Sequence, residues 1–193
     1  HTAIYLKWQL KALYEFNHPE EFEVIIVDNS SPPEIEALQQ LENQYCAHNN
    51  IKIIRNDEPM PDGTGSTHHA IGIELVLEHA NSDYLLIQDP DFFWVRKNYL
   101  RLFAAYLDTG HVAIGAPYKR PVGFGKSHFP TAFGCAYRVA DLEKNDFYPA
   151  LDKDFIKQTN TTYPHPEFEA SADVSWKVRE KLSHAAFISF KQR

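Results

Sequence analysis

The feature that most constrains the fold is a short apolar run that ends abruptly in acidic and turn-forming residues. Phe22–Val27 has the length and composition of a strand buried on both faces. Asp28 follows it directly, and the signals of a helix start come soon after. Ser31 is a suitable N-cap, Pro32 suits the first helical position, and Glu34 can close a capping box. The pattern predicts a strand that passes into a helix, which is the repeating unit of an alternating α/β fold.

The same alternation continues along the whole chain. Helices are expected at Thr2–Phe16, Pro32–Tyr45, Thr67–His79, Asn98–Leu107, Leu151–Ile156 and Asp173–Leu182. Further strands are expected at Ile51–Arg55, Tyr84–Ile87, His111–Ala116, Ala132–Arg138 and Ala186–Phe190. Loops are expected at Asn56–Ser66 and Pro117–Pro130, and irregular structure over most of Asp141–Pro166. This order predicts a Rossmann-like α/β fold with a central, mostly parallel sheet flanked by helices, and a strand is expected before the first helix.

A second apolar run, Tyr84–Ile87, breaks into Asp89-Pro90-Asp91. In an extended backbone, residues two apart point to the same side, so the two carboxylates could converge just beyond a buried strand. Two carboxylates on one side suit a hard cation such as Mg²⁺ or Mn²⁺. The alternative is an ordinary polar turn, because Asp and Pro are common turn residues.

Two other segments lie where ligands often bind. Asp28 and Asn29 sit at the carboxyl end of a predicted strand, where open α/β sheets bind ligands, although Asp28 could simply line the turn. Gly63 and Gly65 precede a helix whose backbone N–H groups can hold an anion, with a flexible loop as the alternative. His68 and His69 begin this helix, where an ordinary polar surface is the alternative to a ligand contact.

Composition limits the classes of function. A length of 193 residues suggests one domain, and a net charge of −7 argues against a broad nucleic-acid-binding surface. Cys46 and Cys135 are far apart and have no metal-like spacing, so neither a disulfide framework nor a thiolate metal site is expected. No apolar run approaches the roughly 20 residues of a membrane span, and no signal peptide is visible, so a cytoplasmic protein is expected.

Three segments in a fixed order carry a resemblance to a known family. Glu23–Ser31 is similar to a strand that ends in V-D-[DN]-[GS]-S, and Gly65–Asp91 is similar to a helix followed by a D-x-D strand. Phe133–Arg138 and then Asp173–Arg179 are similar to an acceptor-side strand and the helix after it. Together these segments resemble the GT-A glycosyltransferases, most closely the inverting group called family 2. The resemblance implies a single GT-A domain over residues 1–193, with a nucleotide-binding half at 1–116 and an acceptor-side half at 117–193.

The resemblance also implies an activity: metal-dependent, inverting transfer of a sugar from a nucleotide-diphosphate donor to a hydroxyl acceptor, such as one on a glycan. Asp28 would hold the nucleobase or ribose, Asp89 would face the ribose or the metal, and Asp91 would ligate Mn²⁺ or Mg²⁺. Further donor-binding positions implied by the resemblance are Asn29, Ser30, Gly65 and His68.

The catalytic base is the point at which the chain departs from the family pattern. Ala170 and Ser171 occupy the positions of the family's Glu-Asp pair, which leaves Glu169 and Asp173 as candidates for the group that takes the acceptor proton. His68-His69 likewise replaces the family's Arg-Asn pair. The alternative function is therefore a catalytically silent GT-A-like module that binds a sugar nucleotide, and a remoter alternative is a nucleotidyltransferase on a similar fold.

Overall fold

The computed structural model describes residues 3–29, 35–56, 65–117, 130–144 and 187–189. The helices are α1 (Ala3–Phe16), α2 (Ile35–Tyr45), α3 (Gly65–His79), α4 (Tyr99–Asp108) and α5 (Val139–Lys144). The strands are β1 (Val24–Asp28), β2 (Ile51–Arg55), β3 (Tyr84–Gln88), β4 (Ala113–Pro117), β5 (Pro130–Arg138) and β6 (Phe187–Ser189). Short 3₁₀ turns are η1 (Pro19–Glu21) and η2 (Cys46–His48). The helices expected at 151–156 and 173–182 lie outside the described residues.

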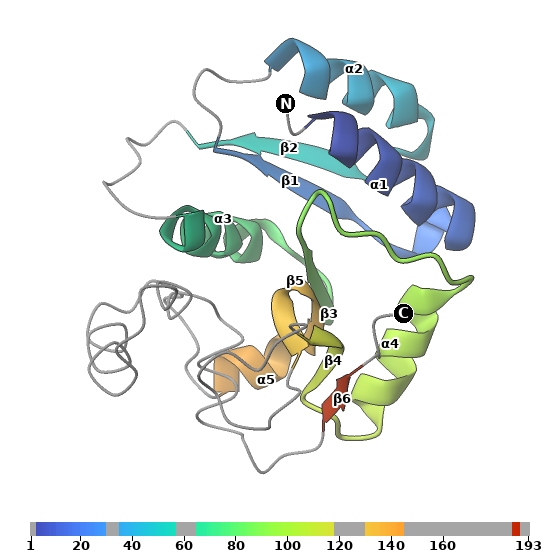
Figure 1. Ribbon diagram of the computed structural model, residues 1–193, viewed down its shortest axis with the longest axis vertical. Coiled ribbons are helices and arrows are strands. Elements are labelled where there is room, and N and C mark those ends of the chain that lie inside the picture. Colours follow the sequence, from blue (N-terminus) through green and yellow to red (C-terminus); the bar gives the residue numbers. More distant parts are fainter. Residues whose placement is uncertain (1–2, 30–34, 57–64, 118–129, 145–186, 190–193) are drawn as a thin grey trace.

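The described strands confirm the α/β class and form two hydrogen-bonded sheets (Figure 1). Strands β1 and β2 pair in parallel. The larger sheet has the order β3-β5-β4-β6, in which β4 and β6 are parallel and β5 runs antiparallel to both β3 and β4. Three strands of the larger sheet therefore share one direction, but β5 lies between two of them, so the described sheet is mixed, with two antiparallel pairings and one parallel pairing. The strands differ from the expectation in that those described are divided between two sheets.

Helices cover both faces of the larger sheet because β3 is apolar on both faces. Leu85 and Ile87 are buried in a cluster that includes Ile73 of α3 and Leu142 of α5. Tyr84 and Leu86 point the other way and pack against the cluster of α4, whose buried residues are Tyr99, Phe103 and Leu107. This division follows from the two-residue period of a strand. The length and apolar composition of this run therefore gave a correct indication of a strand buried on both sides.

Helices α1 and α2 cover the smaller sheet. Their buried leucines form one cluster with partly buried side chains of β1 and β2; these leucines are Leu6, Leu10, Leu38 and Leu41. Their i, i+3 and i, i+4 spacings place each pair on a single helix face. Burial of this apolar face, rather than intrinsic helix propensity, provides most of the stability of such surface helices.

Helix α5 corrects the sequence analysis, which expected irregular structure from Asp141 onward. The helix occupies Val139–Lys144. Arg138 donates from Nε to Asp141 Oδ2 at 2.9 Å and from Nη2 to Asp141 Oδ1 at 3.1 Å, and Leu142 is buried against the larger sheet. A single apolar anchor is too short a pattern to show helical periodicity, so tertiary packing decides this element.

The end of α1 is joined to the start of α4. Asn17, which is buried, accepts a hydrogen bond at its Oδ1 from the backbone N–H of Leu100 at 3.2 Å. The backbone N–H of Asn98 donates to Phe16 O at 2.6 Å. The first of these bonds satisfies one of the N–H groups that a helix start leaves without an intrahelical partner. Asn17 therefore performs a capping role for a helix that begins more than 80 residues later.

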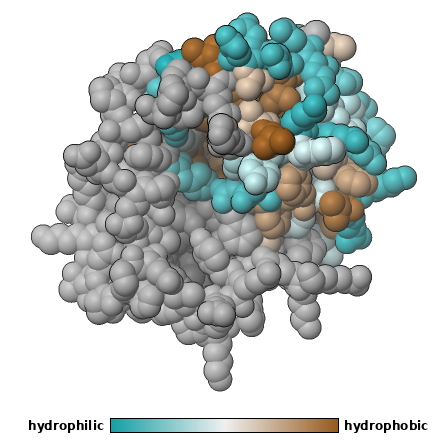
Figure 2. Space-filling model, turned by 45° about the horizontal axis from the view of Figure 1, so that its top comes forward, coloured by the Kyte–Doolittle hydropathy of each residue, from teal (hydrophilic) through white to brown (hydrophobic). Residues whose placement is uncertain are grey.

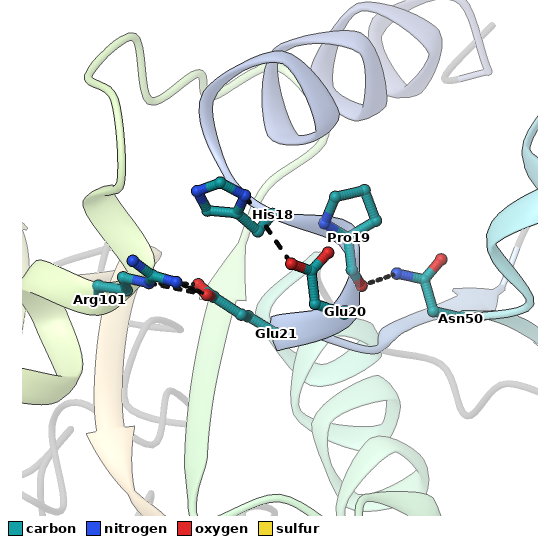
Figure 3. Close-up of polar contacts among 6 residues, drawn as sticks. All are labelled: His18, Pro19, Glu20, Glu21, Asn50 and Arg101. Atoms are coloured by element: carbon teal, nitrogen blue, oxygen red, sulfur yellow. Dashed lines mark hydrogen bonds and ion pairs between the residues drawn. The ribbon is translucent and has the colours of Figure 1, made fainter.

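Turn η1 links α1 to β1 and is held by the side chains of Asn50, just before β2, and of Arg101 on α4 (Figure 3). Asn50 donates from Nδ2 to Pro19 O at 2.7 Å and to Phe22 O at 3.0 Å. On the other side, Arg101 of α4 donates from Nε to both carboxylate oxygens of Glu21, at 2.7 and 2.8 Å, and its Nη2 also contacts Oε1. These contacts tie the start of β1 to both β2 and α4.

The Glu21–Arg101 pair yields a prediction for pH dependence. The hydrogen bond from Arg101 lowers the pKa of the Glu21 carboxyl below its ordinary value. A lowered folded-state pKa contributes stability above the unfolded-state pKa, and this contribution is lost as the pH falls through the folded-state pKa. We expect an NMR titration of Glu21 to have its midpoint below that of an ordinary glutamate, and Arg101→Gln to move the midpoint upward. Equal midpoints in the two proteins would contradict this account.

The outer surface of α1 and α2 retains large apolar side chains. Ile4, Trp8 and Ile35 are exposed, and Lys11 Nζ lies 5.5 Å from the centre of the Trp8 ring. In Figure 2, apolar residues lie beside hydrophilic ones across the described part of this face. Apolar side chains interspersed with polar ones are common on protein surfaces. Among the helices of the described ranges, none has the length and apolar character that crossing a lipid bilayer requires.

Candidate functional site

A cavity of about 840 Å³ runs between β1 and β3, and residues along the whole length of both strands line it. Side chains of α1, α3, β1 and β3 contribute to its walls, most of which are apolar. Its polar lining includes Asp28, Asn29, His69, Gln88 and Asp89. The carboxyl ends of β1 and β3 therefore open onto the same cavity. This is the edge at which α/β sheets commonly bind ligands.

Asp28 is the last residue of β1 and is only 8% exposed. Its register partner on β2 is Arg55, and its backbone carbonyl accepts a hydrogen bond from Asn56 N at 3.1 Å. The next residue, Asn29, lies close to α3, because a Cβ at Gly72 would be 3.3 Å from Asn29 Nδ2. The absence of a side chain at Gly72 thus lets α3 approach the end of β1, where both predicted polar residues line the cavity.

The backbone after β3 is turned, not extended as the sequence argument assumed. Phe92 N donates to Asp89 O at 3.0 Å, which closes a four-residue turn with Pro90 at its second position, where proline is favoured. Alternation of side chains therefore does not apply across Asp89-Pro90-Asp91. Asp89 lines the cavity with a side chain that is 43% exposed. Asp91 is exposed and is not among the residues that line the cavity.

His69 is a site residue that the sequence analysis did not select. Its Nε2 lies 3.7 Å from Asp89 Oδ1, and its side chain is 34% exposed. His69, Gly72, Ile73 and Val76 all line the cavity, and their spacing of three and four residues places them on one face of α3. His69 lies four residues before the buried Ile73 and so on the same face of α3. This spacing could have distinguished it from its neighbour His68.

The remaining predicted residues divide into two groups. Ser30, Glu169 and Asp173 lie outside the described residues. Gly65 is the first residue of α3, which begins two residues earlier than expected, and His68 belongs to the same helix. Only the backbone of these last two residues is described. Their roles as donor-binding residues therefore stay predictions.

An aromatic cluster anchors the turn Asp89–Phe92, here called the acidic turn. A Cβ at Gly134 of β5 would lie 2.6 Å from Phe92 Cε1, so the Phe92 ring rests directly against that backbone. The ring centres of Phe92 and Trp94 are 5.0 Å apart in an edge-to-face arrangement, and those of Trp94 and Phe103 are 4.9 Å apart. Such pairs add stability beyond their buried area. The turn is thereby fixed to both β5 and α4.

The described residues suit a divalent ion that is shared with a ligand. Within the described ranges, no group of three or more His, Cys, Asp or Glu side chains is placed to hold a metal by itself. Mg²⁺ and Mn²⁺ prefer oxygen ligands, and such ions are often bound by one or two carboxylates together with phosphates and water. Asp89 at the cavity provides one such carboxylate, whereas Asp91 is exposed and does not line the cavity, so its role as a second ligand stays a prediction.

The family follows from comparison with known sequences. The profile of glycosyl transferase family 2 matches residues 6–178. The chain belongs to glycosyl transferase family 2. This result confirms the resemblance that the three ordered segments carried, and it places the protein in a family of enzymes. No curated protein sequence matches this chain significantly.

Solved structures show the same fold. A mannosyltransferase from Pyrobaculum calidifontis, in complex with GDP-Man and Mn²⁺, matches with a TM-score of 0.56 and 19% identity over 74% of this chain and 43% of the other. TarS from S. aureus matches with a TM-score of 0.55 and 22% identity over 76% of this chain and 47% of the other. The chain thus spans less than half the length of either protein. At these identities the matches establish the GT-A-like fold.

Proposed function

We propose that this protein transfers a sugar from a nucleotide-diphosphate donor to a hydroxyl acceptor, with inversion at the anomeric carbon and with the aid of a divalent cation. The observation that carries the proposal is that Asp28, Asn29 and Asp89, which lie at the carboxyl ends of β1 and β3, all line one cavity. Membership of glycosyl transferase family 2 supports the sugar-nucleotide donor. The GDP-Man and Mn²⁺ bound to the similar mannosyltransferase are consistent with it.

Each side chain has a distinct part in this proposal. The Asp28 carboxylate accepts hydrogen bonds from the nucleobase or the ribose, and its burial makes such bonds stronger than they are in water. Asp89 would hold the cation, with Asp91 as the second carboxylate that the family resemblance implies. A bound cation supplies charge stabilisation for the departing nucleoside diphosphate. His69 lies beside Asp89, on the side of the cavity formed by α3.

The reaction is a single displacement. The acceptor oxygen forms a bond to the anomeric carbon as the bond from that carbon to the diphosphate oxygen breaks, and the electron pair leaves with the nucleoside diphosphate. The acceptor proton passes to a carboxylate, for which Glu169 and Asp173 are the candidates.

The second candidate function is binding without transfer. It is favoured by one sequence observation: Ala170 and Ser171 stand where the family has its Glu-Asp pair. A module of this kind would bind the sugar nucleotide through Asp28 and Asp89 and would lack a base for the acceptor proton.

Calorimetry with UDP-, GDP- and dTDP-sugars in the presence of Mn²⁺ tests the donor site. We expect one of the three donors to bind, and we expect chelation of the metal to weaken that binding. Absence of binding for all three would overturn the proposed function.

Transfer assays separate the enzyme from the silent module. We expect either Glu169→Gln or Asp173→Asn to reduce transfer by about 10²–10⁴-fold while donor affinity is retained, because a general base contributes to the rate and little to ground-state binding. Donor binding with no hydrolysis or transfer in the unmodified protein would favour the silent module.

A further inference from the structure

We propose that Gln9 is a positioning residue for the acidic turn, defined as Asp89–Phe92. The inference rests on the function proposed above, because it assigns Gln9 the role of fixing Asp89 relative to the rest of the donor site. Gln9 lies on α1, 80 residues before Asp89 in the chain. It belongs to none of the motifs that indicate the family.

The side chain of Gln9, which comes from another part of the chain, bonds to both ends of the acidic turn. Its Nε2 donates to Asp89 O at 2.6 Å and to Phe92 O at 3.1 Å. A glutamine amide nitrogen carries two hydrogens, so one side chain can serve both carbonyls. These are the backbone carbonyls of the first and last residues of the turn. The Gln9 amide therefore bridges its two ends.

Two further contacts of the turn come from the larger sheet. Gln88 Nε2 of β3 donates to Phe92 O at 2.5 Å, and the ring of Phe92 rests on Gly134 of β5. Gln9 differs from these because α1 packs on the smaller sheet, through Leu6 and Leu10. It therefore connects the turn after β3 to the helix that covers β1.

This connection bears on the donor site because β1 and β3 belong to separate sheets among the described strands. Asp28 ends β1, Asp89 follows β3, and both line the same cavity. A ligand that contacts both residues requires a fixed separation between the two strand ends. Gln9 joins the helix that covers the smaller sheet to the turn at the end of the larger sheet, so its hydrogen bonds help to set that separation. A small error in the separation would weaken ligand binding and slow the reaction.

The first test measures the turn itself in the metal-free protein. Gln9→Met keeps the length of the side chain and removes both donor hydrogens, and Gln9→Asn keeps the amide but is one methylene shorter. We expect the Phe92 amide, which donates within the turn, to exchange with solvent about tenfold faster in both variants. Gln39→Met, at an exposed glutamine of α2, is the matched control and should leave this exchange unchanged.

The second test measures binding of Mn²⁺ with GDP or UDP by calorimetry at a temperature well below unfolding. We expect Gln9→Met to raise the dissociation constant about tenfold, while Gln39→Met leaves it unchanged. A role confined to stability would lower the unfolding temperature of Gln9→Met without changing this constant.

Unchanged exchange at Phe92, or faster exchange with unchanged affinity, would overturn the inference. If the unmodified protein binds neither nucleotide with Mn²⁺, the proposed donor site fails instead, and the exchange measurement still decides whether Gln9 holds the turn.

Discussion

Asp89→Asn is expected to lower the rate of sugar transfer by about 10²–10³-fold, since a bound cation contributes several kcal/mol to stabilising the charge of the transition state. Asparagine has nearly the same shape as aspartate but lacks the charge that a hard cation requires. Asp89 lies at the cavity with its side chain 43% exposed, so the substitution leaves no buried charge without a partner. The free energy of unfolding should therefore change little, and the loss should appear in steady-state kinetics and in the affinity for Mn²⁺.

A matched control is available at the other end of β3. Asp83 is an exposed aspartate immediately before this strand and is not among the residues that line the cavity, so Asp83→Asn should retain full activity. Asp91→Asn should act in the same direction as Asp89→Asn if both carboxylates hold the cation. Equal activity of Asp89→Asn and Asp83→Asn would show that the acidic turn is only structural.

Leu107→Ala is expected to lower the free energy of unfolding by about 2–5 kcal/mol, the range for removing a fully buried leucine side chain. Leu107 is 0% exposed and belongs to the cluster that packs α4 against the larger sheet. The cost combines the lost transfer of apolar surface from water with the cavity that the substitution leaves behind. Urea or thermal unfolding measures this loss.

Leu100→Ala on the same helix provides the comparison for Leu107→Ala. Leu100 is only partly buried at the margin of the same cluster, so its removal should cost clearly less. Equal losses at the two positions would contradict the assignment of Leu107 to the centre of the core. Neither leucine belongs to the acidic turn, so both variants should retain metal binding while they remain folded.

Most helices and strands could be predicted from short stretches of sequence, because the spacing of apolar residues matches the period of the helix or strand that buries them. Ile51–Arg55 is a strand with the expected bounds, and the helix expected at Thr2–Phe16 is found at Ala3–Phe16. The predictions were wrong in segments that are too short to show a repeating pattern of apolar residues. Helix α5 depends on one buried leucine and on the Arg138–Asp141 pair. The acidic turn depends on a hydrogen bond that closes it, which the alternation argument cannot include.

The candidate site shows the same division. Asp28, Asn29 and Asp89 could be selected because they lie at or just after the carboxyl ends of apolar runs, where α/β folds commonly bind ligands. To identify His69 as a cavity residue, one must know which face of α3 is buried, and the buried Ile73 marks that face. The role of Gln9 could be identified only from the packing of α1, because its hydrogen-bond partners lie 80 and 83 residues away in the sequence.

The amino-acid sequence alone thus determined the α/β class, the order of the elements, the family and the acidic residues at two strand ends, since all of these are carried by local patterns and ordered motifs. The tertiary structure decided which side chains meet across the cavity. Contacts such as those of Gln9 and His69 with the turn after β3 depend on how helices pack on sheets, and packing brings together groups that no local period relates.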